Sequence, residues 1–473
     1  MPEGLLEVEP RVVPALDPAV RPAYLGNKAF VAAVRETGRA VPLGFGLWRP
    51  NGAISVYRTC AFPKGDRDAE NATYAERILK YLLWQKGAAK VIVAGPPEIA
   101  DHLCTTYGEK GPRAFDASFM GNVYERPFEV VSVAPADFPD ENETSLAIGR
   151  HLSGCRIGFD AGGSDRKVAA VIDGKEVFSC EVVWHPKLES DPAYHFQGVD
   201  DSIRRAAAHL PRVDAIGVSS AGVYVDNKTR VASLFRKVPP HLFDRHIKSL
   251  YLDIAKKWGD VPVHVANDGD VAALAGAMSL NDQPVLGWAM GTSLAAGYVD
   301  SAGHIAGWLN ELAFAPFDYA REAPVDEEWS GDRGTGVNYF SQDAVIRLAP
   351  RAGIDLSREN TPAAKLSAVQ ALLESGDARA RRVFETIGIY LGYALAQSAE
   401  FYPLEHVLVL GRVTSGHGGA ILVEMARQVL ALEAPELAIR LRIHLPDETS
   451  RRVGQAVAAA SLPVIPAAPR VGG

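Results

Sequence analysis

The sequence predicts an α/β protein with more than one domain, and three observations support this prediction. Short apolar runs typical of buried strands alternate with segments of helical periodicity along the chain. The 473 residues are enough for two to four domains of roughly 100–200 residues each. The composition, 47% hydrophobic and 22% charged, is ordinary for a globular protein and excludes a disordered or fibrous chain.

The first part of the chain contains the signals of a hairpin, a helix and a further strand. The segments PLGFGLW and AISVYRTCAF are predicted to be strands of a hairpin, because the turn signal Asn51-Gly52 lies between them. A helix should follow, since the apolar residues between Ala75 and Leu83 share one helical face. Asn71 is a candidate for the N-terminal cap of that helix. The apolar run VIVAG predicts the next strand.

A polar stretch near residues 134–150, APADFPDENET, indicates a boundary. The segment after this boundary repeats the order of strands and helix predicted for the first part of the chain. Two strands surround the turn signal Asp173-Gly174, a helix follows near residues 199–209, and then comes the apolar strand AIGVSSAG. Two explanations stay open, an internal duplication or the general frequency of such units in proteins.

The last third of the chain also alternates helix and strand. Apolar and small residues from Val383 to Ser398 recur on one helical face, and Pro403 should end that helix. The run VLVLG that follows is typical of a buried strand. The segment GQAVAAAS predicts a helix of small residues, which can pack closely on a neighbouring element.

Charge, cysteine content and hydropathy exclude several classes of protein. The chain has 49 Lys and Arg against 57 Asp and Glu, a formal net charge of −8, which disfavours nucleic acid as a partner. The 4 cysteines form no CxxC pair, so neither a cysteine zinc site nor a dense disulfide framework is expected. No apolar stretch reaches the roughly 18 residues of a membrane helix, and the N-terminus lacks the basic start of a signal peptide. We expect a cytoplasmic protein without a membrane partner.

The segment DAGGSDRK joins two predicted strands in a turn that could hold phosphate. Gly162 and Gly163 let the backbone approach an anion closely, and Ser164 adds a hydroxyl donor. Lys167 or Arg166 would supply the compensating positive charge. The alternative is an ordinary Gly-Gly hairpin turn without a ligand.

The segment ANDGD lies between the predicted strand VPVHV and an alanine-rich helix. A carboxylate at a strand end is well placed to reach a ligand, so Asp268 could act as a base. The alternative is capping of the following helix, which fits Asp270 best and could also use Asn267 or Asp268.

The segment MGTSLAAG forms a third candidate site, again between two predicted strands. It offers Gly291 and the hydroxyls of Thr292 and Ser293 in one turn. Two turns of this kind, in separate parts of the chain, could grip a polyphosphate from both sides.

The order of these motifs resembles the superfamily of sugar kinases, hsp70 and actin, and within it the ROK family of bacterial sugar kinases and repressors. DAGGSDRK is similar to the family's first phosphate motif and ANDGDVAALAG to its Asn-Asp motif. MGTSLAAGYVD is similar to the second phosphate motif and NELAF to the Glu-Leu-Gly-His motif. The resemblance extends from residue 155 to 462, roughly two thirds of the chain, and ends in GQAVAAAS.

The resemblance implies a two-lobed ribonuclease H-like (actin-like ATPase) fold that holds ATP and Mg²⁺ between its lobes and a sugar at the base of the cleft. It places the N-terminal lobe at residues 151–275 and the C-terminal lobe at 276–473, with the closing helix returning to the N-terminal lobe. Residues 1–150 lie outside it and are expected to form an extra α/β region. A cap over the cleft, a dimer surface and a degenerate half-lobe all stay open for that region.

The resemblance also assigns roles to individual residues. Asp268 would be the general base for the attacking hydroxyl, while Asn267 and Glu311 would bind sugar hydroxyls. Asn310 and Phe314, beside Glu311, are expected to contact the same substrate. The residues expected to hold the nucleotide come from both turns and from the strand end VLVLG, with Asp160 also near Mg²⁺: Asp160, Gly162, Gly163, Ser164, Lys167, Gly291, Thr292, Ser293, Gly411 and Arg412.

The chain departs from the family pattern at several of these positions. Phe314 stands where the family has a histidine and no cysteine follows Cys180, so the family's zinc site is not expected. An apolar ring at position 314 would stack on a sugar face or exclude a hydroxyl. Side chains that differ from those usual in the family are expected to alter substrate contacts or to crowd the nucleotide: Asp270, Asn310, Ser293, Ala295 and Arg412.

The resemblance therefore favours an ATP-dependent kinase that phosphorylates a hydroxyl of a sugar or sugar-like polyol, acting as a homodimer. The alternative is a non-catalytic ROK-like sugar-binding or regulatory protein. Residues 1–150 show no helix-turn-helix pattern, which weighs against regulation through DNA.

Overall fold

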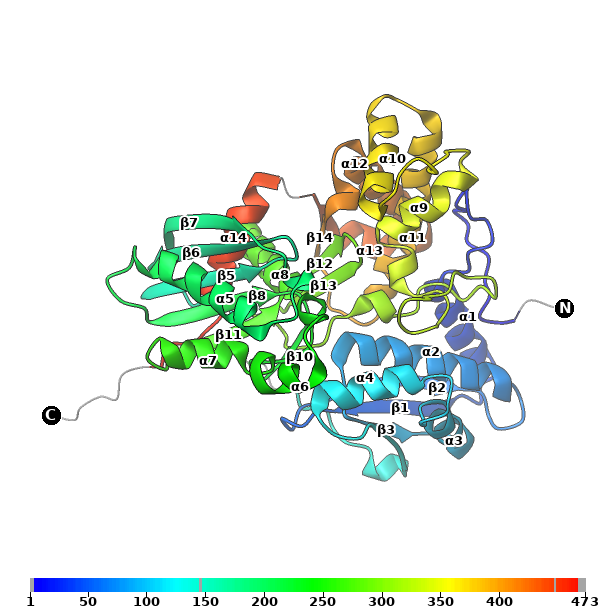
Figure 1. Ribbon diagram of the computed structural model, residues 1–473. Coiled ribbons are helices and arrows are strands. Elements are labelled where there is room, and N and C mark those ends of the chain that lie inside the picture. Colours follow the sequence, from blue (N-terminus) through cyan, green and yellow to red (C-terminus); the bar gives the residue numbers. More distant parts are fainter. Residues whose placement is uncertain (1–3, 144–146, 446–447, 467–473) are drawn as a thin grey trace. The chain divides into compact units, whose positions relative to one another are not determined.

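The computed structural model describes residues 4–143, 147–445 and 448–466, with the side chains of 448–453 left aside (Figure 1). Its strands form two four-stranded sheets, one five-stranded sheet and one two-stranded sheet, and helices alternate with them. The α/β prediction is confirmed. None of the described helices combines the length and apolarity needed to cross a membrane.

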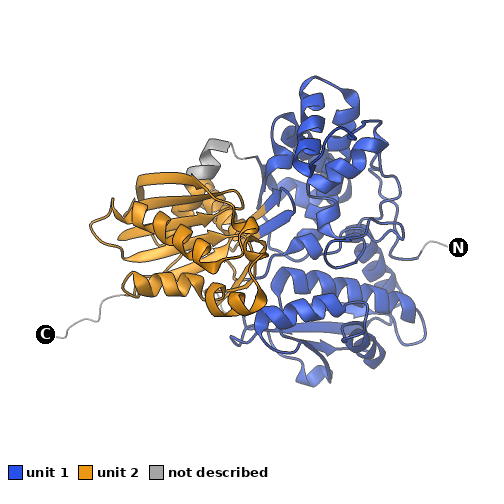
Figure 2. Ribbon diagram, viewed as in Figure 1, with its two compact units in different colours: residues 1–144, 288–296, 308–445 blue, residues 145–287, 297–307, 446–473 orange. Residues whose placement is uncertain are grey.

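The chain divides into two compact units, which Figure 2 colours separately. Unit 1 consists of residues 1–144, 288–296 and 308–445, and unit 2 consists of residues 145–287, 297–307 and 446–473. The lobe boundaries expected from the sequence stay a prediction.

The first sheet of unit 1 has the strand order β2-β1-β3-β4. Strands β1 and β2 pair antiparallel around the Asn51-Gly52 turn, which confirms the hairpin. The elements of this region are α1 (Ala23–Glu36), β1 (Val41–Trp48), β2 (Ile54–Ala61), α2 (Asp68–Lys86), β3 (Lys90–Ala94), α3 (Pro97–Thr106), α4 (Ala114–Tyr124) and β4 (Glu129–Val133).

The predicted capping role of Asn71 is wrong. Helix α2 begins three residues earlier, and Arg67 occupies the cap position. The Asn71 side chain is buried and makes two hydrogen bonds of 2.9 Å with the backbone of Phe62, so it ties the helix to the end of β2. Both roles use asparagine to satisfy backbone groups, and local sequence does not distinguish them.

The second sheet has the strand order β13-β12-β14-β15; helices α9, α10 and α11 lie between β13 and β14 in the sequence, and α12 and α13 lie between β14 and β15. Helix α11 is almost wholly buried and packs against α12. The elements are β12 (Val285–Met290), β13 (Leu294–Val299), α9 (Gln342–Arg351), α10 (Pro362–Glu374), α11 (Ala378–Ser398), β14 (His406–Leu410), α12 (His417–Glu433), α13 (Pro435–Arg440) and β15 (Arg442–His444).

Unit 2 is built on a five-stranded sheet of order β11-β8-β5-β6-β7. Strands β5, β6 and β7 form an antiparallel meander, whereas β8 is parallel to both β5 and β11. The elements are β5 (Cys155–Ala161), β6 (Asp165–Ile172), β7 (Lys175–Val183), α5 (Pro192–Ala207), β8 (Ala215–Ser220), β9 (Val223–Val225), β10 (Lys228–Val231), α6 (Pro240–Leu242), α7 (Leu250–Lys257), β11 (Val263–Asn267), α8 (Asp268–Leu280) and α14 (Glu448–Ala460).

The pairing of the strands argues against an internal duplication. The third strand of the first segment, β3, pairs directly with β1 of its hairpin, whereas its counterpart in the second segment, β8, pairs with β5, which lies between β8 and the β6-β7 hairpin. The two segments therefore share an order of elements in the sequence but not a sheet topology.

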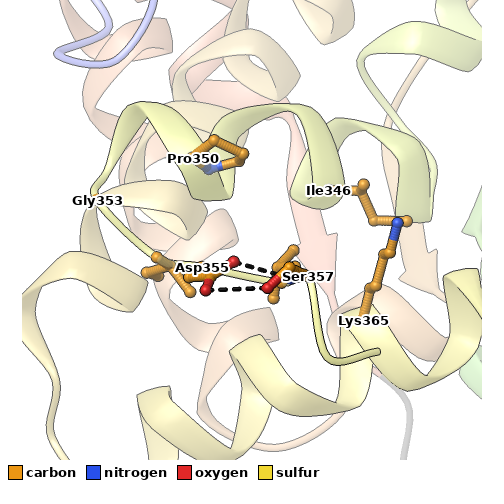
Figure 3. A pocket seen from close by; sticks show the side chains of 8 residues that line it. Ile346, Pro350, Gly353, Asp355, Ser357 and Lys365 are labelled. Carbon is orange, nitrogen blue, oxygen red and sulfur yellow. Dashed lines mark hydrogen bonds between the residues drawn. The ribbon is translucent and has the colours of Figure 1, made fainter. Parts of the chain in front are cut away.

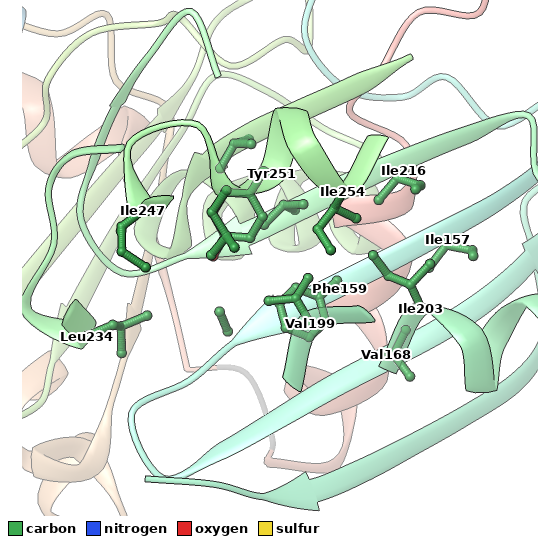
Figure 4. Packing of buried hydrophobic residues seen from close by; sticks show 14 of the residues in the cluster. Ile157, Phe159, Val168, Val199, Ile203, Ile216, Leu234, Ile247, Tyr251 and Ile254 are labelled. Atoms are coloured by element: carbon green, nitrogen blue, oxygen red, sulfur yellow. The ribbon is translucent and has the colours of Figure 1, made fainter. Parts of the chain in front are cut away.

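Helices cover both faces of the unit 2 sheet. On one face, Val199 and Ile203 of α5 and Ile254 of α7 pack with Phe159 in a single apolar core (Figure 4). On the other face lies α14, the helix of small residues. It approaches so closely that a methyl group on Gly158 would overlap the carbonyl of Ala456. The predicted close packing of this helix is confirmed.

Candidate active site

Trp184 forms hydrogen bonds with the turn between β5 and β6. The indole Nε1 of Trp184 donates to the carbonyl of Gly162 at 2.8 Å and to that of Asp165 at 3.0 Å, and its backbone N–H donates to Ser164 O at 3.1 Å. Within the described part of the chain, the backbone N–H groups of Gly163 and Ser164 donate to no acceptor. Trp184 therefore fixes the carbonyl groups of the turn, and the two amide donors stay available to bind an anion.

Lys167 and Arg166, the two residues expected to give this turn a positive charge, each form an ion pair with a carboxylate of the protein. Lys167 Nζ forms an ion pair of 2.9 Å with Asp165, on its own strand. The guanidinium of Arg166 is buried and pairs with Asp201 at 2.9 Å. For either residue to bind a phosphate, its present carboxylate partner must be shared or released.

Lys187, which our sequence reasoning did not single out, lies beside the same turn. A methyl group on Gly163 would come within 3.3 Å of its ammonium nitrogen. Lys187 follows β7 and lies three residues after Trp184 in the sequence. The only local signal was a lysine after a buried tryptophan, and that pattern does not identify a ligand.

Asp160 lies at the carboxyl end of β5 and is 7% exposed. Burial raises the pKa of its carboxyl group to about 6, and the negative charge of Asp268 acts in the same direction. A hydrogen bond of 2.7 Å from the Ser219 hydroxyl and the charge of Lys167 oppose this rise. Asp160 is thus a buried carboxylate whose charge is only partly compensated.

Asn267 and Asp268 lie where β11 passes into α8. Asn267 is the N-terminal cap of the helix, since its Oδ1 accepts from Gly269 N–H at 2.7 Å, and its amide nitrogen donates to Gly222 O at 2.8 Å. The capping alternative therefore holds for Asn267 rather than for Asp270, which accepts from Tyr298 N–H at 3.1 Å instead. A primary amide keeps one N–H and one lone pair after these bonds, so Asn267 can still contact a hydroxyl.

Asp268 is the first residue of α8 and is half-buried. Burial raises the pKa of its carboxyl group, while backbone hydrogen bonds and the charge of Lys187 lower it. Such a carboxylate is a stronger proton acceptor than a fully solvated one, as a general base requires.

The strand register explains why these residues meet. Asp160 of β5 is paired with Ser219 of β8, and Ser220 is paired with Asn267 of β11. The carboxyl ends of these three parallel strands therefore form one edge. Polar side chains at such an edge form ligand sites in α/β sheets.

The residues present fit a magnesium ion better than a zinc ion. Asp160 and Asp268 are close enough for the charge of one to raise the pKa of the other, so a cation would relieve their repulsion. Mg²⁺ is usually held by one or two carboxylates together with substrate phosphates and water. The described residues contain no group of three or more His, Cys, Asp or Glu side chains that could hold a metal ion by themselves.

Unit 1 contains the second expected phosphate turn, between β12 and β13. Thr292 and Ser293 are exposed, and the guanidinium of Arg412 donates to the Thr292 hydroxyl at 3.0 Å. Gly411 has a φ of 102°, and a methyl group there would overlap the carbonyl of Met290 in β12. The structure thus brings Gly291, Thr292, Ser293, Gly411 and Arg412 into one neighbourhood.

Asn310 and Glu311, two of the residues expected to bind the sugar, are positioned by the N-terminal region. The backbone N–H groups of Asn310 and Glu311 donate to the carbonyls of Gln85 and Trp84 at the end of α2, both at 2.9 Å. Asn310 has a φ of 52°, in the left-handed region that glycine favours and asparagine tolerates. Asparagine therefore suits this backbone conformation.

Phe314 belongs to an aromatic cluster rather than standing alone. Its ring centroid lies 4.3 Å from that of Trp84, 5.8 Å from Phe115 and 6.2 Å from Phe119. Two of these rings come from α4, so the N-terminal region builds this wall. An apolar wall beside Glu311 favours contact with the apolar face of a ligand.

A pocket of about 470 Å³ also lies in unit 1, between α9 and the start of α10 (Figure 3). The carboxylate of Asp355 on its wall already accepts from the backbone and hydroxyl of Ser357 at 2.9 and 3.0 Å. None of the residues that line this pocket was expected to bind a substrate.

No protein-family model and no curated protein sequence matches the chain. Solved structures match it. A ROK hexokinase from Thermus thermophilus superposes with a TM-score of 0.50 at 18% identity, over 64% of this chain and 97% of that one. A ROK family transcriptional regulator, a homologue of the E. coli MLC protein, gives a TM-score of 0.51 at 19% identity, over 66% and 79%. The chain has the ROK fold.

The resemblance drawn from the motifs is confirmed at the level of the fold. A hexokinase and a transcriptional regulator share this fold, so the fold alone does not separate catalysis from regulation. The function must be argued from the site.

Proposed function

We propose that the protein is an ATP-dependent kinase that phosphorylates a hydroxyl group of a sugar or sugar-like polyol. One observation supports this most directly: two mutually repelling carboxylates, Asp160 and Asp268, lie with the turn of Gly163 at one end of the unit 2 sheet. A regulator that only binds a sugar has no need for a buried and a half-buried carboxylate that both have a raised pKa, whereas phosphoryl transfer needs both a base and charge compensation.

In the proposed reaction, Asp268 accepts the proton of the attacking hydroxyl. The hydroxyl oxygen forms a bond to the terminal phosphorus of ATP, and the bond from that phosphorus to the bridging oxygen breaks, so ADP leaves. The amides of Gly163 and Ser164 and, from unit 1, Thr292 and Arg412 would bind phosphate oxygens. Mg²⁺ bound to the phosphates near Asp160 would supply further charge neutralisation.

The acceptor would contact Asn267, Glu311 and Phe314. The aromatic cluster around Phe314 supports an acceptor with an apolar face, such as the ring of a pyranose. The assembly as a homodimer and the lobe boundaries stay predictions.

Release of ADP tests the proposal. A panel of hexoses, N-acetylhexosamines and polyols is supplied with ATP and Mg²⁺, and at least one acceptor should raise ADP release above the rate without acceptor. Asp268→Asn should lower that rate by about 10²–10⁴, because proton transfer to a positioned base contributes that factor. The Tm shift caused by the acceptor should persist in the variant.

Asp260→Asn is a matched control, since Asp260 is exposed and lies outside the site. Turnover that is equal in the wild type and Asp268→Asn would exclude Asp268 as the base. Binding of a sugar without binding of ATP would instead favour the alternative of a sugar-binding regulator, which the fold shared with a ROK regulator supports.

A further inference from the structure

The first phosphate turn needs a cation that its own segment does not supply freely. A nucleoside triphosphate carries several negative charges, and its terminal phosphate gains further charge density during transfer. Lys167 and Arg166 are nearest in sequence, but each is paired with a carboxylate at 2.9 Å. Their positive charges are largely neutralised within the protein.

Lys187 is placed differently. Its ammonium group lies beside Gly163, at 3.3 Å from the point where a β-carbon would lie. Within the described part of the chain, this ammonium group forms neither a hydrogen bond nor an ion pair. It is therefore an uncommitted cation beside the two amide donors of the turn.

The segment that carries Lys187 is the one that fixes the turn. Trp184, three residues earlier, binds two carbonyl groups of the turn through its indole nitrogen. Pro186 is buried and starts a short 3-10 helix that ends at Leu188, so the backbone around Lys187 is anchored. The backbone that carries Lys187 and the turn with the amide donors are thus joined by the hydrogen bonds of Trp184.

The position of Lys187 also relates it to Asp268. Its charge lowers the pKa of the Asp268 carboxyl group against the effect of burial. In the proposed reaction, a cation that acts on the base and lies against the phosphate turn would be near both the incoming oxygen and the phosphoryl group.

We infer that Lys187 binds the terminal phosphate of the nucleoside triphosphate and neutralises the charge that develops there during transfer. This inference rests on the proposed kinase function. It adds a phosphate-binding residue that the resemblance to ROK proteins does not assign. Lys187 takes no proton and forms no covalent bond in this role. Its ammonium group acts as a point charge with three donors.

Binding measurements with two nucleotides test this role. Calorimetry compares a non-hydrolysable ATP analogue with ADP, both with Mg²⁺, for the wild type, Lys187→Met, Lys187→Arg and Lys175→Met. Lys187→Met should weaken binding of the ATP analogue by about 10- to 100-fold, as expected for a lost charge-assisted hydrogen bond. Binding of ADP should change by no more than about threefold, because ADP lacks the phosphate in question.

Lys187→Arg keeps the charge and should restore most of the affinity for the analogue. Lys175 is exposed at the opposite end of β7, so Lys175→Met removes a lysine from the same strand and should bind both nucleotides as the wild type does. With an acceptor present, Lys187→Met should also lower kcat by about 10²–10³, as for other groups that stabilise transition-state charge.

The possible failures are distinguishable. A wild type that binds neither nucleotide overturns the kinase proposal itself, and the role of Lys187 with it. Undiminished binding of the ATP analogue by Lys187→Met overturns only the role of Lys187. An equal loss for ADP and the analogue also overturns it, since Lys187 would then support the turn in general rather than contact the terminal phosphate.

Discussion

At the scale of single residues, the carboxyl group of Asp160 should make the stability of the protein depend on pH. Its pKa in the folded protein is raised to about 6. In the unfolded chain an aspartate titrates near pH 4, so between about pH 4 and 6 the folded state holds the proton more tightly. The proton on Asp160 therefore contributes in full to the free energy of unfolding below about pH 4. This contribution is lost as the pH rises through about 6.

Asp160→Asn should therefore stabilise the protein at neutral pH. The amide is isosteric and uncharged, and its oxygen can still accept from Ser219. At pH 7.5 we expect the free energy of unfolding to rise by on the order of 2–3 kcal/mol, given 1.36 kcal/mol for each pKa unit. The gain should shrink towards pH 4. Urea denaturation at the two pH values measures it, and a gain that does not depend on pH would contradict the raised pKa.

Individual residues also show where sequence reasoning succeeds and where it fails. Asp268 could be found because it lies at a predicted strand end before Gly269, and Asp160 could be found because the resemblance to ROK proteins assigns it to the nucleotide site. Lys187 could not be found, because its relation to Gly163 arises from the packing of β7 and Trp184 against the turn. Asn71 was misjudged for a similar reason, since its partner Phe62 is a tertiary neighbour.

At the scale of elements, the turn between β5 and β6 depends on Trp184. The sequence predicts two strands joined by a turn with Gly162 and Gly163, and the structure has this hairpin. Its use as an anion site depends on the direction of its amide groups, which the indole determines by binding the carbonyls of Gly162 and Asp165. A pattern of residue types contains no such information about direction.

Trp184→Phe keeps the ring in the core but removes both hydrogen bonds of the indole. We expect a loss of about 1–3 kcal/mol in stability and a roughly tenfold weaker binding of the ATP analogue, because the amide donors are no longer held in place. Trp258→Phe is the matched control, since it removes one indole hydrogen bond, to Asp200, in the same unit. Calorimetry and thermal unfolding of both variants separate the two effects. Weaker nucleotide binding in Trp258→Phe as well would mean that binding follows stability rather than the turn.

At the scale of the whole chain, residues 1–144 belong to the same compact unit as residues 308–445. The sequence motifs assigned only residues 155–462 to the ROK resemblance and left the first part as an addition of open role. The structure connects that part to the Asn310-Glu311 loop through α2 and to Phe314 through α4. Such contacts join residues more than 190 positions apart and leave no periodic signal in the sequence.

Asp332 makes the strongest of these connections. It is 6% exposed and forms ion pairs with Arg113 at 2.7 Å, Arg77 at 2.9 Å and Lys80 at 3.3 Å. All three cations belong to the N-terminal region, whereas Asp332 follows the NELAF motif by about twenty residues. Glu76 and Asp116 lie in the same network, so three carboxyl groups face the three cations.

Asp332→Asn should therefore destabilise the protein far more than the loss of a surface ion pair does. Removing one partner from a buried network leaves uncompensated charge and typically costs about 3–5 kcal/mol. Asp253→Asn breaks an exposed pair with Lys256 at 3.2 Å and should cost less than about 1 kcal/mol. Urea unfolding of both variants gives the comparison. Equal stabilities would show that this network does not hold the N-terminal region to the rest of its unit, whereas a large difference would show that it does.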